Sequence, residues 1–140
     1  MSRAPGSPQP AAPGLLIAGC GALGLELAAQ ASAAGWRVFG LRRRPPPGPA
    51  PLTWIAADVA SLDAGRLPVA PRALVYAVSA GGRELEQYQA AYLRGPLALW
   101  SALARAGAAP PRCLLVSSTA VWGRADGGWV DEATPASPAD

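Results

Sequence analysis

The chain has 140 residues, of which 51% are hydrophobic and 15% charged, and its formal net charge is +3. This length and composition predict one globular domain with a substantial core, and they exclude a disordered chain. No apolar run approaches the roughly 18 residues that a membrane span needs, so no membrane partner is expected.

The first 13 residues contain four prolines and no apolar segment. They predict a flexible tail rather than a signal peptide, which favours a cytoplasmic protein whose domain spans residues 14–140. Cys20 and Cys113 lack metal-ligand spacing and the chain has no histidine, so no metal site is expected. Arginine supplies all twelve positive charges, and apart from one cluster these are scattered, so no nucleic-acid partner is predicted.

Apolar strands alternate with helices along the chain. We expect strands at 15–18, 37–41, 53–57, 73–78 and 113–117. A helix is expected at 22–34, ended by Gly35, and a short polar turn or helix at 61–67. A long helical stretch is expected at 83–106, with a bend at Gly95-Pro96. Residues 42–51 and 119–140 are expected to be loops. The first helix places Leu23, Leu27, Ala31 and Ala34 on one face, and the second places Leu93, Leu97, Trp100 and Ala104 on one face.

The first, fourth and fifth strands are continuous apolar runs, as expected for strands that are covered on both faces. Strands that alternate with helices predict right-handed crossovers and a parallel sheet. The fold class is therefore α/β, a Rossmann-type doubly wound parallel sheet of about five strands in the order 3-2-1-4-5. In such a sheet a ligand binds at the carboxyl ends of the strands, where the order reverses.

A glycine-rich turn, Gly19-Cys20-Gly21-Ala22-Leu23-Gly24, joins the first strand to the first helix. In G-x-G-x-x-G the first glycine permits a tight turn, the second lets a pyrophosphate approach the backbone, and the third lets helix and strand pack closely. Glycine is common here, at 16 of 140 residues, but the position between strand and helix favours a nucleotide-binding loop over a purely structural turn. The residues expected to contact the cofactor in this loop are Gly19, Gly21, Ala22, Leu23 and Gly24.

Arg42-Arg43-Arg44 follows the second strand, and Arg42 lies eighteen residues after Gly24. A Rossmann domain that selects NAD places an acidic residue in this region, but none occurs between Glu26 and Asp58. Guanidinium groups instead pair with the oxygens of a 2′-phosphate. Arg42 and Arg43 therefore favour NADP as the cofactor, with NAD as the alternative and a solvated basic turn as the competing interpretation.

The sequence resembles the N-terminal half of an extended or atypical short-chain dehydrogenase/reductase of the NAD(P)-dependent epimerase/dehydratase group. The resemblance covers about residues 14–138, and it implies that the Asp58 carboxylate lies against the adenine amino group. It also implies that the end of the fourth strand lines the cofactor. The cofactor-binding residues that it adds are Asp58, Val59, Ala77, Val78 and Ser79. The four segments that carry it are 19–24, 56–59, 76–82 and 116–123.

The segment Val116–Gly123 is similar to the family's Ser-Ser-x-x-Val-Tyr-Gly. This likeness implies that Ser118 hydrogen-bonds the reacting hydroxyl or carbonyl of a small-molecule substrate, such as a nucleotide sugar or another carbonyl or hydroxyl compound. In the family a tyrosine of Tyr-x-x-x-Lys is the general acid/base, and the lysine lowers the pKa of that tyrosine. Alternatively, Ser118 belongs to a polar strand end and only hydrogen-bonds the backbone of the following turn. A homodimer is a further expectation.

The departures from the family pattern keep two functions open. Ala18 stands where extended members have their first glycine, and Trp122 replaces the common tyrosine. The Tyr-x-x-x-Lys pair is missing, because all three tyrosines precede the fifth strand and the chain has no lysine. The chain is then a fragment of a longer enzyme, a cofactor-binding remnant or an atypical member. Its function is either that of an NAD(P)-dependent oxidoreductase or epimerase, or that of a non-catalytic NADP-binding or redox-sensing module. The fold does not name a substrate.

Overall fold

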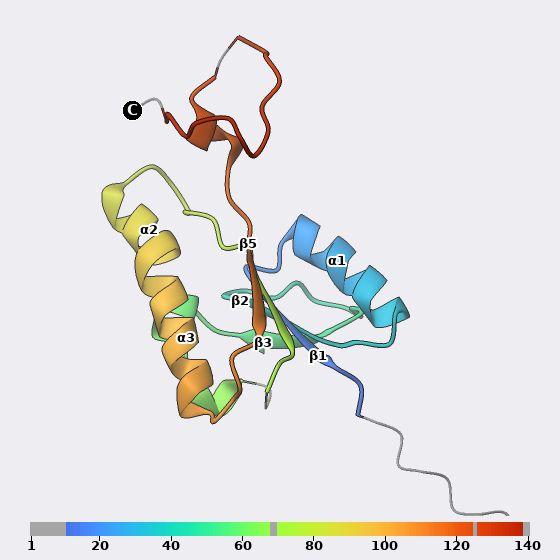
Figure 1. Ribbon diagram of the computed structural model, residues 1–140. Helices are drawn as coiled ribbons and strands as arrows, with labels where there is room; N and C mark the ends of the chain where they lie inside the picture. Colours follow the sequence, from blue (N-terminus) through green and yellow to red (C-terminus); the bar gives the residue numbers. More distant parts are fainter. Residues whose placement is uncertain (1–10, 68–69, 125, 139–140) are drawn as a thin grey trace, which may run out of the picture.

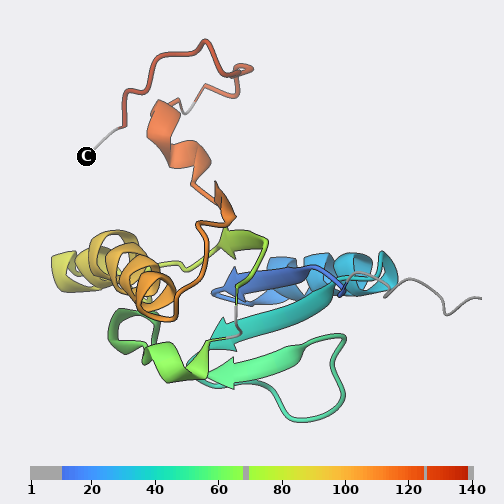
Figure 2. The ribbon, with the colours of Figure 1, turned by 60° about the horizontal axis from the view of Figure 1, so that its bottom comes forward.

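A five-stranded parallel sheet forms the centre of the computed structural model, which describes residues 11–67, 70–124 and 126–138. The strand order is β3-β2-β1-β4-β5 and all pairs are parallel; Figure 1 and Figure 2 show the sheet from two sides. This confirms the predicted fold class and strand order. Residues 1–10 of the predicted tail lie outside the described residues. The strands are β1 (Gly14–Ala18), β2 (Arg37–Arg42), β3 (Thr53–Ala56), β4 (Ala73–Tyr76) and β5 (Arg112–Leu115).

Helices cover both faces of the sheet (Figure 1). On one face lies α1 (Ala22–Ala33). On the other, α2 (Leu85–Gln89), a π-helical turn η3 (Ala90–Arg94) and α3 (Gly95–Arg105) form one continuous rod. Neighbouring residues of β1 enter different cores, because Leu16 and Ala18 pack on the α3 side while Leu15 and Ile17 pack on the α1 side. Burial on both sides explains the unbroken apolar pattern of this strand.

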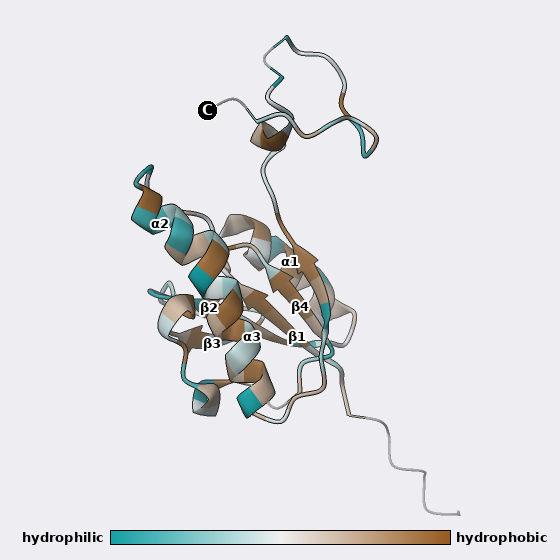
Figure 3. Cartoon of the chain, turned by 60° about the vertical axis from the view of Figure 1, so that its left-hand side comes forward, coloured by the Kyte–Doolittle hydropathy of each residue, from teal (hydrophilic) through white to brown (hydrophobic). Residues whose placement is uncertain are grey.

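The buried faces of the helices differ in part from the predicted ones, although Leu27 and Ala31 of the predicted α1 face are half-buried against the core. In α1 the buried residues are Gly24 and Ala28, whereas Leu23 is 61% exposed. In α3 the buried residues are Gly95, Leu99, Ala102 and Leu103. Both helices are apolar on most sides, so the close approach of glycine and alanine to the sheet selects the buried face. The four residues expected together on the second helix, Leu93, Leu97, Trp100 and Ala104, are exposed, and brown turns of this rod face outward in Figure 3.

The connections follow the prediction with local differences. The polar segment after β3 forms two 3₁₀ turns, η1 (Val59–Ser61) and η2 (Ala64–Arg66), which Asp58 and Asp63 cap. β4 and β5 each end two residues earlier than predicted. The region after β5 contains a 3₁₀ turn, η4 (Thr119–Trp122), where a loop was expected. None of the helices within the described ranges combines the length and the hydropathy that crossing a bilayer requires.

Candidate nucleotide-binding site

A cavity of about 380 Å³ opens at the carboxyl ends of β1 to β4, on the side where the strand order reverses. Segments that are distant in the sequence form its walls: the glycine loop after β1, the arginines after β2, the 57–59 segment after β3, the 77–81 region after β4, and the α2–η3 part of the rod. Its size is in the range of small-molecule and cofactor sites. The lining residues are Gly19, Cys20, Gly21, Leu41, Arg42, Arg43, Arg44, Ala57, Asp58, Val59, Ala77, Val78, Ser79, Gly81, Gln87, Ala90 and Ala91.

The three glycines of the loop have different local surroundings. Gly19 has a φ of +79°, and a Cβ at this position would lie 2.5 Å from the Val78 amide nitrogen. A Cβ at Gly24 would lie 3.0 Å from Cys20 Sγ, so this glycine permits close packing of α1 on the sheet. Gly21 has a φ of −91°, and the nearest atom to an added Cβ would be the Gly19 carbonyl oxygen at 4.0 Å. The fold thus requires Gly19 and Gly24, whereas Gly21 keeps open space beside the cavity.

The loop leaves backbone donors at the start of α1. The amides of Gly19 and Cys20 both donate to the Leu41 carbonyl, and the Gly21 amide donates to the Gly19 carbonyl. The next three amides, from Ala22 to Gly24, belong to the first helical turn and have no acceptor within the helix. The N-cap residue Gly21 offers no side-chain cap, and the first turn carries no acidic residue. These amides and the helix dipole form a place suited to a phosphate.

Three arginines make one side of the cavity positive. The Arg42 Nη1 donates to the Cys20 carbonyl at 3.4 Å, and Arg43 and Arg44 are exposed along the rim. Within the described residues, the ion pairs are formed by other arginines, Arg94 with Glu86 and Arg124 with Asp126. The guanidinium groups at the cavity are therefore available to an anionic ligand.

Asp58 is the acidic residue of the lining. Its Oδ1 accepts a hydrogen bond from the Ala60 amide at 2.9 Å, which caps η1 and fixes the carboxylate at the end of β3. The second carboxylate oxygen can accept from an amino group in the cavity, as the family resemblance implies for adenine. The neighbouring Val59 is buried and offers an apolar contact beside it.

Cys20 lies in the glycine loop but is fully buried and packs between Gly24 and Gly40. Burial raises the pKa of its thiol, and the charge of Arg42 acts in the opposite direction. A thiol that is buried and held protonated is a packing group rather than a nucleophile. Across the described part of the chain, no three His, Cys, Asp or Glu side chains gather in a way that could hold a metal ion.

Ser118 does not line the cavity. It is exposed and caps η4, where its Oγ accepts a hydrogen bond from the Ala120 amide at 3.2 Å. The segment after β5 extends beyond the carboxyl edge of the sheet (Figure 1). The contact of Ser118 with a substrate stays a prediction.

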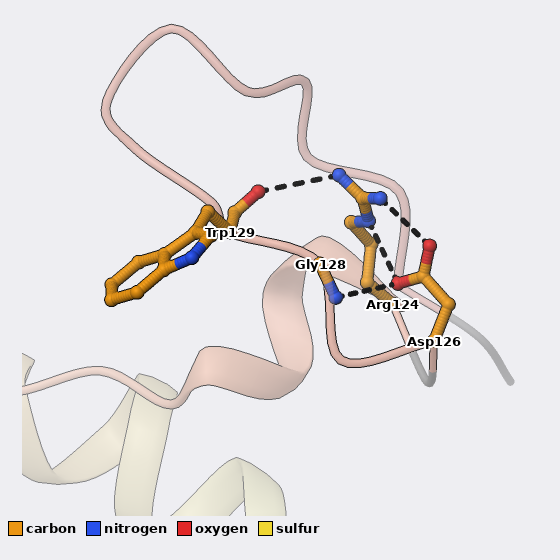
Figure 4. Close-up of polar contacts among 4 residues, drawn as sticks. All are labelled: Arg124, Asp126, Gly128 and Trp129. Atoms are coloured by element: carbon orange, nitrogen blue, oxygen red, sulfur yellow. Dashed lines mark hydrogen bonds and ion pairs between the residues drawn. The ribbon is translucent and has the colours of Figure 1, made fainter.

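Local contacts hold the end of this segment. Arg124 pairs with Asp126 through two hydrogen bonds and also donates to the Trp129 carbonyl (Figure 4). The Gly128 amide donates to the same carboxylate. The Arg124 guanidinium holds the pKa of the Asp126 carboxyl below its usual value, and the Gly128 amide adds to this effect. The Trp129 side chain is 97% exposed. These polar contacts therefore lie within the segment itself.

The structure brings together most of the predicted cofactor residues, namely Gly19, Gly21, Arg42, Arg43, Asp58, Val59, Ala77, Val78 and Ser79. Ala22, Leu23 and Gly24 do not line the cavity, but they supply the first amides of α1. Sequence reasoning missed the wall formed by Gln87, Ala90 and Ala91. No motif marks these residues, because the packing of the rod on the sheet brings them to the cavity.

No family model matches the sequence, and no curated protein matches it. Solved structures do match. A protein from Methylobacillus flagellatus assigned to the NAD-dependent epimerase/dehydratases is 38% identical, with a TM-score of 0.69, and the match covers 91% of this chain and 45% of that one. MoeE5 in complex with UDP-glucose and NAD is 25% identical, with a TM-score of 0.69, over 89% of this chain and 42% of that one. Uronate dehydrogenase from Agrobacterium tumefaciens is 19% identical, with a TM-score of 0.67, over 91% of this chain and 49% of that one, and shares the fold.

The chain spans less than half the length of each of these structures. The predicted resemblance to the epimerase/dehydratase group is confirmed.

Proposed function

We propose that this chain is the dinucleotide-binding domain of an NAD(P)-dependent oxidoreductase of the epimerase/dehydratase type. The observation that carries the proposal is the cavity at the switch point of the sheet, which the glycine loop and three arginines border. The uncapped amides of α1 suit the pyrophosphate. Asp58 and Val59 suit an adenine ring, and NAD bound to MoeE5, a 25% identical protein, supports a dinucleotide as the ligand.

Within this function, NADP is the favoured cofactor. Arg42, Arg43 and Arg44 line the cavity where a domain selective for NAD would carry an acidic residue. A 2′-phosphate carries charge that guanidinium groups recognise through paired hydrogen bonds. Each such charge-assisted contact contributes about 1.5–3 kcal/mol, or at least about tenfold in affinity.

The test compares two double variants that each remove two positive charges. Arg42→Ala with Arg43→Ala should weaken NADPH binding at least about tenfold more than NADH binding, as measured by calorimetry, since both dinucleotides lose the loop contact that Arg42 makes but only NADPH loses the phosphate contacts. The control is Arg37→Ala with Arg72→Ala, at the amino-terminal edge of the sheet and outside the cavity. NADPH and NADH binding with equal affinity to the parent chain would contradict the preference. Equal losses in both double variants would indicate a general charge effect.

A small molecule with a carbonyl or hydroxyl group is the proposed substrate, and a nucleotide sugar is the favoured type because MoeE5 is complexed with UDP-glucose. The lysine-assisted tyrosine that is the general acid/base of the family is absent from these 140 residues, since they contain no lysine and none of the three tyrosines follows β5. The second candidate is a non-catalytic NADP-binding or redox-sensing module, which the position of Ser118 outside the cavity supports. The downstream reading frame separates the two functions, because a Tyr-x-x-x-Lys helix encoded after these residues would favour the enzyme, whereas the 140-residue chain is expected to show no turnover under either function.

We also propose that the protein is a homodimer, which forms through an apolar stripe on the outer side of the α2–α3 rod. Tyr88 and Tyr92 of this stripe pack against each other with ring centroids 5.6 Å apart. A two-fold axis would place this stripe against the same stripe of a second copy, so that each copy covers the other. The stripe residues are Leu85, Tyr88, Tyr92, Leu93, Leu97 and Trp100, which are between 44% and 71% exposed.

Light scattering after size-exclusion chromatography tests the dimer. Leu97→Glu should give a monomer, because a carboxylate in the middle of the stripe would be desolvated in the interface. Leu115→Glu changes an equally exposed leucine of β5 and is the matched control, with both positions 61% exposed. A dimer that persists in Leu97→Glu, or that is lost in Leu115→Glu, would rule out the stripe as the interface.

A further inference from the structure

The rod that forms one wall of the cavity contains an irregular turn. At η3 the backbone widens into a π-helical turn, and the Gly95 amide donates to the Ala90 carbonyl rather than to the Ala91 carbonyl. The next residue, Pro96, has no amide hydrogen and cannot serve the Ala91 carbonyl either. The π register, together with the proline at 96, therefore leaves the Ala91 carbonyl without a helical donor.

Tyr76 supplies the missing donor. Its hydroxyl, at the carboxyl end of β4, donates to the Ala91 carbonyl at 2.5 Å. Both residues are buried, with Tyr76 2% and Ala91 4% exposed. A buried carbonyl without a partner is costly, so this bond stabilises the π turn over the regular α-helical register.

Gly95 completes the contact from the other side. A Cβ at this position would collide with the Tyr76 hydroxyl and would lie 2.9 Å from the Ala90 carbonyl oxygen and 3.0 Å from Val59 Cγ1. The phenol can therefore approach the rod because residue 95 has no side chain. Tyr76, Ala91 and Val59 meet at this point, and they come from the three segments that hold the β4, rod and β3 walls of the cavity.

We infer that Tyr76 is a positioning residue, which holds the π turn so that Ala90, Ala91 and Gln87 stand at the distance from the glycine loop that a bound dinucleotide requires. Tyr76 does not line the cavity itself, although Ala77, Val78 and Ser79 directly after it do. Without the hydroxyl, the turn can relax toward the α-helical register and move that wall. This inference rests on the proposed nucleotide site.

The first experiment measures the turn without a nucleotide. Hydrogen exchange should become at least about tenfold faster in the 90–95 segment of Tyr76→Phe, with the β1 and β2 amides unchanged. Ser101→Ala removes an exposed hydroxyl of the same rod and should leave the exchange as in the parent chain. Unchanged exchange at 90–95 in Tyr76→Phe would overturn the inference, whether or not the chain binds NADPH.

The second experiment tests whether the turn positions the cavity wall. NADPH affinity should fall at least about fivefold in Tyr76→Phe and stay unchanged in Ser101→Ala. In the double variant Tyr76→Phe with Pro96→Ala, the amide hydrogen restored at position 96 can serve the Ala91 carbonyl in the π register, so slow exchange at 90–95 and NADPH affinity should recover together. Exchange that recovers while affinity stays low would overturn the positioning role. A parent chain that binds no dinucleotide would refute the proposed function and leave the exchange result to decide on the turn.

Discussion

Two glycines of the same loop should respond to alanine in opposite ways, and this comparison tests the site directly. Gly19→Ala places a Cβ 2.5 Å from the Val78 amide nitrogen in a residue whose φ is +79°. The left-handed conformation costs about 1–2 kcal/mol and the crowding about 1–3 kcal/mol, which together give about 2–5 kcal/mol. A domain of this size should then melt roughly 5–15 °C lower.

Gly21→Ala should leave the free energy of unfolding nearly unchanged. The φ of −91° is open to alanine, and the nearest atom to its Cβ is 4.0 Å away. The small gain from a stiffer unfolded chain, about 0.4–1 kcal/mol, is offset in part by the poorer N-cap. The methyl group stands at the cavity, where the pyrophosphate must meet the backbone, so NADPH binding should fall strongly, and Gly21→Val should abolish it.

The assays are thermal unfolding followed by circular dichroism and titration calorimetry with NADPH. The expected pattern is a destabilised Gly19→Ala and a Gly21→Ala that melts like the parent chain but binds weakly. A native melting temperature for Gly19→Ala would refute the packing argument. NADPH binding that survives in Gly21→Val would show that the loop has a structural role alone.

Three further outcomes are expected. Burial, the main cause, with smaller contributions from Tyr92 and Asp58, raises the pKa of Tyr76 to about 12. The stability linked to this phenol is therefore complete below about pH 10 and is lost as the pH rises toward 12, and urea unfolding of Tyr76→Phe should lack this loss. The 140-residue chain should show no dehydrogenase or epimerase turnover with NADPH or NADH, because it has no lysine-assisted tyrosine. A positioned acid/base typically contributes about 10²–10⁴-fold in rate, and a robust rate would contradict the prediction. Ser118→Ala should change the free energy of unfolding by less than about 1 kcal/mol, since Ser118 is exposed and caps one short turn. The calorimetric affinity for NADPH should stay unaltered, and a large loss of affinity would place Ser118 at the cavity.

The sequence predicted the sheet because its signals are local. Unbroken apolar runs marked β1, β4 and β5, although β5 is exposed along its length and not covered on both faces as expected. Gly35, whose φ is +84°, marked the end of α1. The strand order followed from the handedness of the crossovers, which is a general property of parallel sheets. The buried face of a largely apolar helix is harder to predict, because several of its faces could be buried. The approach of small residues to the sheet decides it, and this is why Leu23 and Leu97 are exposed.

The bend expected at Gly95-Pro96 illustrates the same limit. The proline correctly indicated an irregular helix, and the irregularity lies one turn earlier, at 90–94. Its form depends on a hydroxyl that comes from β4, fifteen residues before Ala91. No spacing rule connects Tyr76 to this turn. For the same reason the strand-end residues of the cavity could be predicted, while the wall formed by the rod could not.

The glycine loop and the arginine segment form one unit, which bears on how cofactor choice is set. The Leu41 carbonyl, at the end of β2, accepts from both the Gly19 and Cys20 amides, at 2.9 and 3.2 Å. The following Arg42 donates back to the Cys20 carbonyl. The strand that carries the cation proposed to select the 2′-phosphate therefore also orients the loop proposed to hold the pyrophosphate. Replacing Arg42 by an acidic residue would change the charge at the ribose and would also remove the hydrogen bond that Arg42 donates to the glycine loop. A change of cofactor preference in this fold should therefore require substitutions in both the glycine loop and the arginine segment.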